Sequence, residues 1–223
     1  GYTALMFAAL KKGNHAIAEA LLAKGADANA RGGINQKSPL SIAIESGDAD
    51  TAKCLVTHGA KMEADLLTAV TSGRLETVRV LLDKGSDPNG KDKSSGWTPL
   101  TIAASLGCAD ITKVLLNQKA DPNLEAVSDT FHSKGFPLTV AAGNGHTEIV
   151  QALLNKGADL KARDEAGQTA LLLAVTNDFI EVVKALLDKK ADLNARASNG
   201  MTAWICAASL GRAGMVKLLL DKG

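Results

Sequence analysis

The chain repeats itself at a period close to 33 residues, and this repetition constrains its fold more than any other feature of the sequence. One turn position recurs seven times, and a second position follows it each time at an offset of twelve residues. The first set is Gly13, Gly47, Gly73, Gly107, Gly145, Asp178 and Gly211; the second is Gly25, Gly59, Gly85, Lys119, Gly157, Lys190 and Gly223. The constant offset predicts seven copies of one small unit instead of a single large core.

Each unit has the pattern of two short helices. The first opens with a polar cap and a small residue or proline, as in Thr98-Pro99-Leu100, and carries a small pair such as Ala103-Ala104. The second has apolar residues at helical spacing, as in residues 149–154, and ends at the second turn position, where glycine is favoured. An Asp-x-Asn turn such as Asp87-Pro88-Asn89 follows.

These motifs together resemble the ankyrin repeat, and residues 136–159 carry the resemblance most fully. The resemblance covers the whole chain. It implies an all-α repeat solenoid, in which antiparallel helix pairs joined by short β-hairpin fingers stack into a curved array. One domain, residues 1–223, is expected. Its repeats are expected at approximately 1–33, 34–63, 64–93, 94–127, 128–164, 165–197 and 198–223.

Two irregular spacings predict irregular fingers. The interval from Gly47 to Gly73 is only 26 residues, so the hairpin that would follow Gly59 is predicted to be missing. The interval from Gly107 to Gly145 is 38 residues, so residues 124–135 are predicted to form a longer finger. Helix stacking is expected to survive both changes, because the fingers project beyond the helical layers.

Other departures concern single positions. Lys119 and Lys190 stand where glycine is favoured, at a cost of roughly 1 kcal/mol each if their φ is positive. The family usually has histidine after Thr-Pro-Leu, and the hydrogen bonds of that histidine must here be replaced or lost. The residues at this position are Met6, Ser41, Leu67, Thr101, Thr139, Leu172 and Ile205.

Composition argues against several functional classes. The 25 basic and 24 acidic residues give a net charge of +1, which disfavours a dedicated nucleic-acid or membrane-surface binder. The three cysteines, Cys54, Cys108 and Cys206, are far apart and are expected to be buried small hydrophobes. No N-glycosylation sequon is present. Together with the cysteine pattern, this favours a reducing compartment, so an intracellular, cytoplasmic location is expected.

No catalytic residue, cofactor or metal site is predicted. The segment from Gly85 to Lys91 is similar to a phosphate-binding loop, but Asp92 replaces the hydroxyl residue and no strand pattern precedes it. The four histidines are scattered along the chain and show no ligand spacing. No set of serine, histidine and aspartate, or of cysteine and histidine, can be assembled from the repeat positions.

Protein–protein recognition is therefore the leading functional hypothesis. In ankyrin repeats the residue before each helix cap faces the concave groove, and an exposed tryptophan there would be a strong contact. For Trp97, packing against the adjacent fingers is an equal alternative, whereas Trp204 is expected in the core. The predicted partner-binding residues are Tyr2, Lys37, Trp97, Gln168 and Met201, with Phe131 and His132 on the long finger.

Two other functions remain open at this stage. The chain could be the targeting module of a larger enzyme or bacterial effector, or it could bind a small molecule or nucleotide in the groove. The chain is also expected to be a piece of a longer solenoid, because it begins inside a hairpin at Gly1 and stops at Gly223. Apolar residues at Met6, Phe7 and Leu10 and at 215–220 then predict end-to-end self-association.

Overall fold

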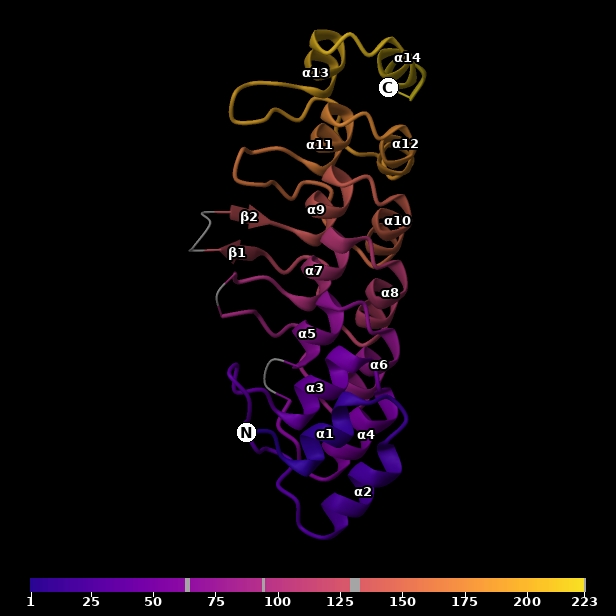
Figure 1. The fold of residues 1–223 in the computed structure, drawn as a ribbon. Coiled ribbons are helices and arrows are strands. Elements are labelled where there is room, and N and C mark those ends of the chain that lie inside the picture. Colours follow the sequence, from indigo (N-terminus) through magenta and orange to yellow (C-terminus); the bar gives the residue numbers. More distant parts are fainter. Residues whose placement is uncertain (63–64, 94, 129–132, 223) are drawn as a thin grey trace. The chain divides into compact units, whose positions relative to one another are not determined.

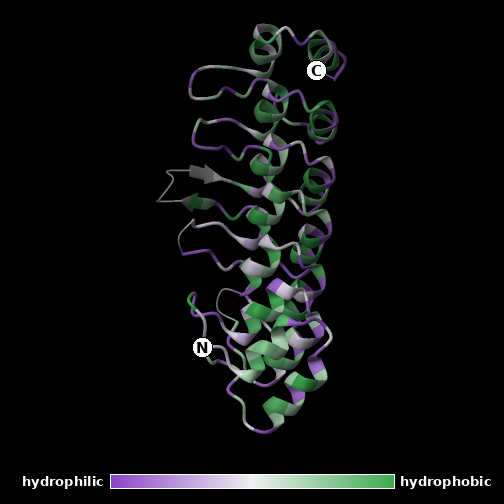
Figure 2. Cartoon of the chain, in the orientation of Figure 1, coloured by the Kyte–Doolittle hydropathy of each residue, from purple (hydrophilic) through white to green (hydrophobic). Residues whose placement is uncertain are grey.

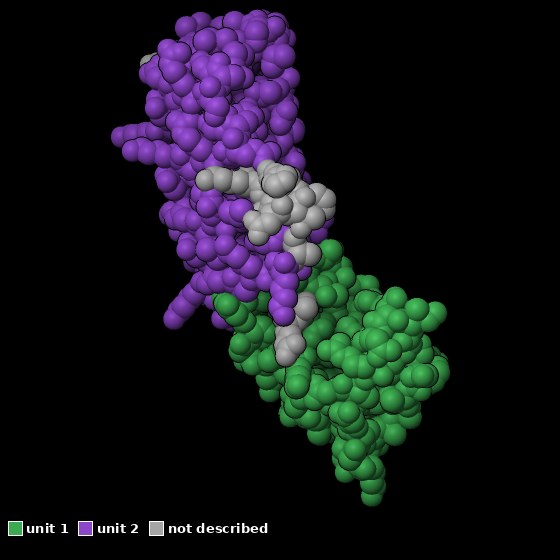
Figure 3. Space-filling view, turned by 90° about the vertical axis from the view of Figure 1, so that its left-hand side faces the viewer, with its two compact units in different colours: residues 1–88 green, residues 89–223 purple. Residues whose placement is uncertain are grey.

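Pairs of short helices follow one another along the chain, as the repeat predicts. The structure, a computed structural model, describes residues 1–62, 65–93, 95–128 and 133–222. It forms two compact units, residues 1–88 and residues 89–223, which are described separately (Figure 3). The first unit contains α1 (Ala4–Leu10), α2 (His15–Ala23), α3 (Pro39–Ser46), α4 (Ala49–Thr57), α5 (Asp65–Thr71) and α6 (Leu75–Asp83).

The second unit contains four further helix pairs and a β-hairpin. These elements are α7 (Pro99–Leu106), α8 (Ala109–Asn117), β1 (Ala126–Ser128), β2 (Ser133–Gly135), α9 (Pro137–Gly143), α10 (Thr147–Asn155), α11 (Ala170–Thr176), α12 (Ile180–Asp188), α13 (Ala203–Ser209) and α14 (Ala213–Lys222).

Like helices stack on like helices within each unit. In the first unit α1, α3 and α5 pack in series, beside the series α2, α4 and α6. In the second unit α7, α9, α11 and α13 form one column and α8, α10, α12 and α14 the other, while the fingers project on the side of the first column (Figure 1). Apolar residues concentrate on the helices and polar ones on the fingers (Figure 2). None of the helices in the described residues is long and apolar enough to span a membrane.

The predicted helix caps are confirmed. The side-chain hydroxyl of the residue before the first helix accepts a hydrogen bond from the amide three residues later, which satisfies an otherwise free helix amide. The donor–acceptor distances lie between 3.1 and 3.4 Å for Thr3, Ser38, Thr98, Thr169 and Thr202.

Hydroxyl groups replace the absent histidines at several repeats. The Ser41 hydroxyl oxygen accepts from the Ser38 amide at 3.0 Å, and the Thr139 hydroxyl oxygen accepts from the Phe136 amide at 3.0 Å. The Thr101 hydroxyl lies 2.9 Å from the hydroxyl of its cap residue. Of the two expected outcomes, replacement or loss, local replacement is thus found where the residue is serine or threonine.

The turn positions adopt the left-handed conformation throughout the described chain. This includes the three that are not glycine, Lys119 at φ 66°, Asp178 at φ 66° and Lys190 at φ 64°. The prediction that the two lysines occupy positions suited to glycine is thus confirmed.

Both irregular fingers differ from the others as the spacing predicts. Residues 58–64 connect α4 to α5, and the described part of this connection contains no strand or bridge. The long finger forms the antiparallel hairpin of β1 and β2, with Ala126 opposite Gly135. Phe131 and His132, the predicted binding residues of this finger, lie outside the described residues.

Asp48 connects the first two repeats through buried hydrogen bonds. It is 2% exposed, and its carboxylate accepts from the Gly13 amide at 2.8 Å and from the Thr51 amide at 3.1 Å and hydroxyl at 2.8 Å. Burial raises the pKa of this carboxyl group, but these hydrogen bonds outweigh burial and hold the pKa below its ordinary value of 3.8.

Replacing Lys119 by glycine should stabilise the protein. We expect the free energy of unfolding to rise by about 1 kcal/mol, because glycine adopts positive φ without strain. Gly157→Ala is the matched control at the equivalent turn. A Cβ atom there would meet nothing within 4 Å, so strain alone should lower stability. Urea unfolding of both variants would measure this, and a stability loss in Lys119→Gly would contradict it.

Replacing Asp48 by asparagine should lower stability near neutral pH by about 1–3 kcal/mol, because one oxygen that accepts hydrogen bonds becomes a donor. The folded-state pKa is depressed, so the contribution of Asp48 is present above its unfolded pKa and is lost as pH falls through the folded pKa. The difference between wild type and variant should therefore shrink below about pH 4. Urea unfolding across a pH series tests this, and a constant difference would refute the assignment.

Candidate functional site

A groove of about 410 Å³ lies in the second unit, over the first helices of three consecutive repeats. Its floor comes from α7, α9 and α11, through Ser105, Val140 and Leu173. Its rim comes from the fingers, through Trp97 on one side and Asp164 and Glu165 on the other. The groove thus combines residues of the fingers with residues of the first helices.

The finger before α7 positions Trp97. The Asp92 amide donates to the Trp97 carbonyl oxygen at 2.9 Å, and the Asp92 carboxylate accepts from the Ser95 amide at 2.7 Å and hydroxyl at 2.8 Å. Trp97 is half-buried. Trp97 was expected either to be exposed for partner contact or to pack against the adjacent fingers. The structure combines the two, because the side chain is partly covered and also lines the groove.

Gly135 lines the groove together with Trp97. It immediately precedes Phe136, the cap residue of α9, as Trp97 immediately precedes Thr98, the cap residue of α7. A Cβ atom on Gly135 would lie only 3.0 Å from the Val140 Cγ2 atom, so the Val140 side chain packs closely against this glycine. The cap motif did not reveal this residue because Phe136, without a capping hydroxyl, stands where five other repeats have serine or threonine.

Two asparagines leave acceptors on the groove floor. The Asn144 side-chain amide donates to the Ser105 carbonyl oxygen at 3.3 Å, and that of Asn177 donates to the Gly143 carbonyl oxygen at 2.8 Å. These bonds fix which end of each carboxamide faces the backbone. Within the described chain, neither side-chain oxygen receives a hydrogen bond, so both can accept one from a ligand.

The charged side chains on the groove rim are acidic. Asp164 is half-buried and accepts from the Gln168 amide at 2.7 Å, which holds its finger closed. Glu165 is exposed beside it. With the two asparagine oxygens, they make this end of the groove rich in acceptors and suited to a ligand that donates hydrogen bonds.

The remaining predicted partner-binding residues of the described chain do not line this groove. Gln168 and Met201 are half-buried in the second unit, outside the residues that line the groove. Tyr2 and Lys37 lie in the first unit. The Tyr2 ring packs 5.8 Å from the Phe7 ring, measured between centroids.

Lys37 is already paired within its own repeat. Its ammonium group lies 2.6 Å from a Glu45 carboxylate oxygen, and this hydrogen bond raises the pKa of the lysine. A partner that bound Lys37 would have to displace the Glu45 carboxylate.

Trp204, which was expected in the core, is half-buried.

The three cysteines lie outside the groove. Burial raises the pKa of the Cys54 and Cys108 thiols, which disfavours their nucleophilic thiolate form. Both are half-buried and Cys206 is buried, and all three are free. The described residues contain no group of three or more potential metal-ligating side chains.

Comparison with known proteins identifies relatives for parts of the chain. It is 38% identical over 93 residues to the ankyrin repeat protein nuc-2 of Neurospora crassa, covering 39% of the chain and 9% of that protein. It is 41% identical over 61 residues to the 2-5A-dependent ribonuclease of Mus musculus, covering 27% of the chain and 8% of that protein. The matches thus span under a tenth of either curated relative.

A solved structure matches the chain over its full length. The human ASB11 ankyrin repeat domain superposes with a TM-score of 0.80 at 26% sequence identity, covering 100% of this chain and 98% of that one. The family description "Ankyrin repeats (3 copies)" matches residues 1–65, 66–126 and 138–223. Because these matches span most of the sequence, the chain belongs to the ankyrin repeat family.

Proposed function

We propose that this chain binds a partner protein through the groove lined by Trp97, Gly135 and Glu165. Ankyrin repeats are generally protein-interaction modules. The observation that carries the proposal is the opening beside the half-buried Trp97, where Gly135 supplies no side chain. An aromatic face that lines a groove can receive a partner side chain, and tryptophan is enriched among the residues that dominate interface energies.

The chemistry of the groove favours a partner segment with a basic side chain. Asp164 and Glu165 supply negative charge, and Asn144 and Asn177 supply neutral acceptors. A lysine or arginine side chain could contact the Trp97 ring and reach these acceptors, which combines a cation–π contact with charge-assisted hydrogen bonds. The stacked helices hold the groove in place before binding, so little conformational entropy is lost on association.

A second candidate is that the chain targets a larger enzyme to its substrate. This alternative is supported by the similarity to the 2-5A-dependent ribonuclease of Mus musculus. In that protein, a segment similar to this chain belongs to an enzyme. The groove would serve the same purpose in both cases. Identification of the bound partner distinguishes them: a substrate of an attached activity indicates targeting, and a regulatory protein indicates a scaffold.

The apolar end layers support a further proposal, association between copies of the chain. Phe7 is 60% exposed on α1, and Leu220 is 66% exposed on α14. Further apolar side chains are exposed on the neighbouring helices: Leu10 on α1, Ile17 on α2 and Ile205 on α13. Contiguous apolar surface of this kind tends to associate.

Replacing Trp97 by alanine should weaken partner binding by more than about 1 kcal/mol, because the aromatic contact is lost. Affinity capture with wild-type protein would identify the partner, and calorimetry would then give the dissociation constants. Glu165→Gln belongs in the same series. It should weaken binding and reduce its salt dependence if the partner residue is basic.

Glu181→Gln is the control, because Glu181 is exposed on the second helix α12, outside the groove. It should bind as the wild type does. Unfolding curves must accompany the affinities: if Trp97→Ala lowers the melting temperature sharply while the folded protein keeps its affinity, Trp97 is structural and the groove proposal is wrong.

Sedimentation velocity over a concentration series tests the end-layer proposal. We expect the wild type to associate as concentration rises and Phe7→Lys to remain monomeric, because a buried charge in an apolar contact is unfavourable. Val127→Lys changes an exposed apolar residue on the long finger and should behave as the wild type does. A wild-type monomer at every concentration would exclude the association.

A further inference from the structure

Asparagines connect successive repeats by a pair of hydrogen bonds that recurs in the structure. At each such step, the asparagine of an Asp-x-Asn turn contacts the end of the second helix in the next repeat. The Asn29 side-chain amide donates to the Gly59 carbonyl oxygen at 3.0 Å, and its side-chain oxygen accepts from the Lys61 amide at 2.8 Å. One carboxamide thus satisfies a free carbonyl and a free amide at a helix end.

The same arrangement occurs twice in the second unit. Asn89 donates to the Lys119 carbonyl oxygen at 3.4 Å and accepts from the Asp121 amide at 2.8 Å. Asn123 donates to the Gly157 carbonyl oxygen at 3.0 Å and accepts from the Asp159 amide at 2.7 Å. The three examples define a carboxamide-binding geometry that the fold uses repeatedly.

Lys161 occupies the asparagine position at the next step. It lies four residues after Gly157, as Asn123 lies four residues after Lys119. Its backbone has the same turn, since its amide donates to the Asp159 carboxylate at 2.8 Å as the Asn123 amide donates to Asp121 at 2.8 Å. Only the side chain differs at this step.

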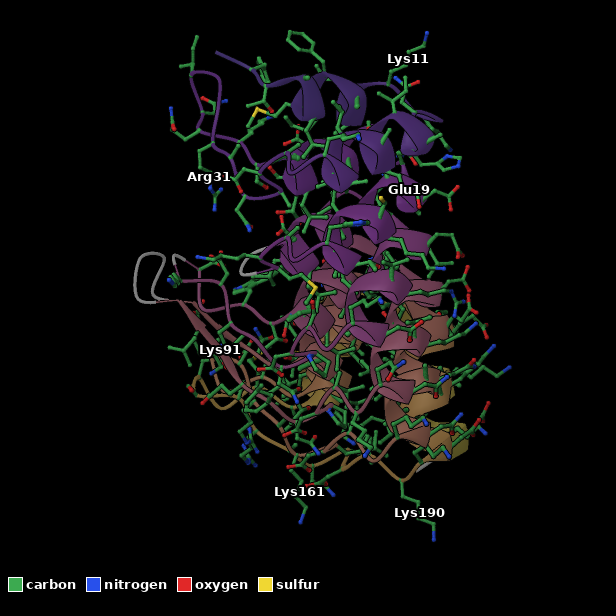
Figure 4. All side chains as sticks on the ribbon, turned by 90° about the horizontal axis from the view of Figure 1, so that it is seen from below. Lys11, Glu19, Arg31, Lys91, Lys161 and Lys190 are labelled. Atoms are coloured by element: carbon green, nitrogen blue, oxygen red, sulfur yellow. The ribbon has the colours of Figure 1, made fainter. Side chains whose placement is uncertain are left out.

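The lysine side chain does not replace the missing carboxamide. Within the described chain, the Lys190 carbonyl oxygen and the Asp192 amide, which correspond to the groups bound elsewhere, form no hydrogen bond. An ammonium group carries no acceptor, so Lys161 cannot satisfy the Asp192 amide in any rotamer. In Figure 4 the side chains of Lys161 and Lys190 both extend away from the ribbon.

A cavity lies at this step. Its volume is about 470 Å³, within the range of ligand pockets, and both the Lys161 turn and residues 190–192 line it. Its apolar walls are Ala158, Leu160, Ala191 and Ala195. It shares no lining residue with the groove of Trp97.

We propose that this cavity binds a carboxamide, supplied by an asparagine or glutamine side chain of a partner protein. The ligand oxygen accepts from the Asp192 amide, and the ligand amide donates to the Lys190 carbonyl oxygen. The ligand thereby completes the pair of bonds that asparagine makes at the other three steps. This contact is separate from the proposed groove and would add a second, sequence-selective point of attachment.

Titration of the isotopically labelled chain followed by amide NMR tests the proposal. The probe is asparagine capped as its N-acetyl, N′-methylamide derivative. We expect a saturable shift of the Asp192 amide signal with weak affinity, since two neutral hydrogen bonds carry the contact. The Lys61 and Asp121 amides, already bound by asparagines and outside the cavity, are internal controls and should not shift.

Two variants of one residue separate the carboxamide from simple charge. Lys161→Asn should restore the internal pair of bonds and weaken probe binding by about tenfold or more, the effect expected when two hydrogen bonds are blocked. Lys161→Ala should keep the cavity open and retain binding. Equal loss in both variants would show that the ammonium group binds the ligand and would overturn the proposal. Thermal unfolding confirms that each variant folds.

The choice of probe decides between ligand chemistries. Capped aspartate, which has the same shape but cannot donate to the Lys190 carbonyl, should bind more weakly. Tighter binding of capped aspartate would identify an anion site, and tighter binding of free asparagine would identify a metabolite site; either contradicts the proposal. Absence of any saturable Asp192 shift does so as well. Trp97→Ala should leave the titration unchanged, so this test and that of the groove fail independently.

Discussion

Stacking between equivalent helices is the interaction on which the rest of this structure depends. The described helices contain between seven and ten residues, and helices of that length are not stable alone in water. Each gains stability by packing against the corresponding helix of the adjacent repeat. Ala103 and Ala104, both fully buried, allow this close approach because their side chains are small. The fingers lie outside these layers, which explains how the repeats pack with one finger absent and another lengthened to the hairpin at 126–135.

Polar contacts between repeats complement this apolar packing. They satisfy backbone groups at helix ends that the helices themselves cannot satisfy. Asp48 receives the Gly13 amide of the preceding repeat, and the Arg212 guanidinium donates to the Val175 carbonyl oxygen at 2.8 Å. A single side chain at a turn therefore determines whether two backbone groups of the next repeat are bound or available. The free groups at Lys190 and Asp192 follow from this dependence.

The candidate sites arise where the repeat becomes irregular. Glycine at 135 lines the groove next to Trp97 at the position before a helix cap, where other repeats have a larger residue. Lysine at 161, in place of asparagine, leaves a cavity where other repeats have an internal bridge. Regular positions carry the packing, and substitutions at them produce surfaces that differ from one repeat to the next. A repeat architecture can acquire separate contacts in this way without a change of fold.

The sequence by itself determined the helix pairs, their caps, the left-handed turns and both irregular fingers. These features are local: a Thr98 hydroxyl reaches an amide three residues away, and the left-handed turn at Lys190 follows from its place after a helix. Only the tertiary structure decided what the groove contains. Asn144 and Asn177 belong to successive repeats, and stacking brings their side chains to one surface with fixed orientation. Neither the position of Gly135 beside Trp97 nor the availability of the Asp192 amide could be derived from the sequence, because both depend on which residues of adjacent repeats come into contact.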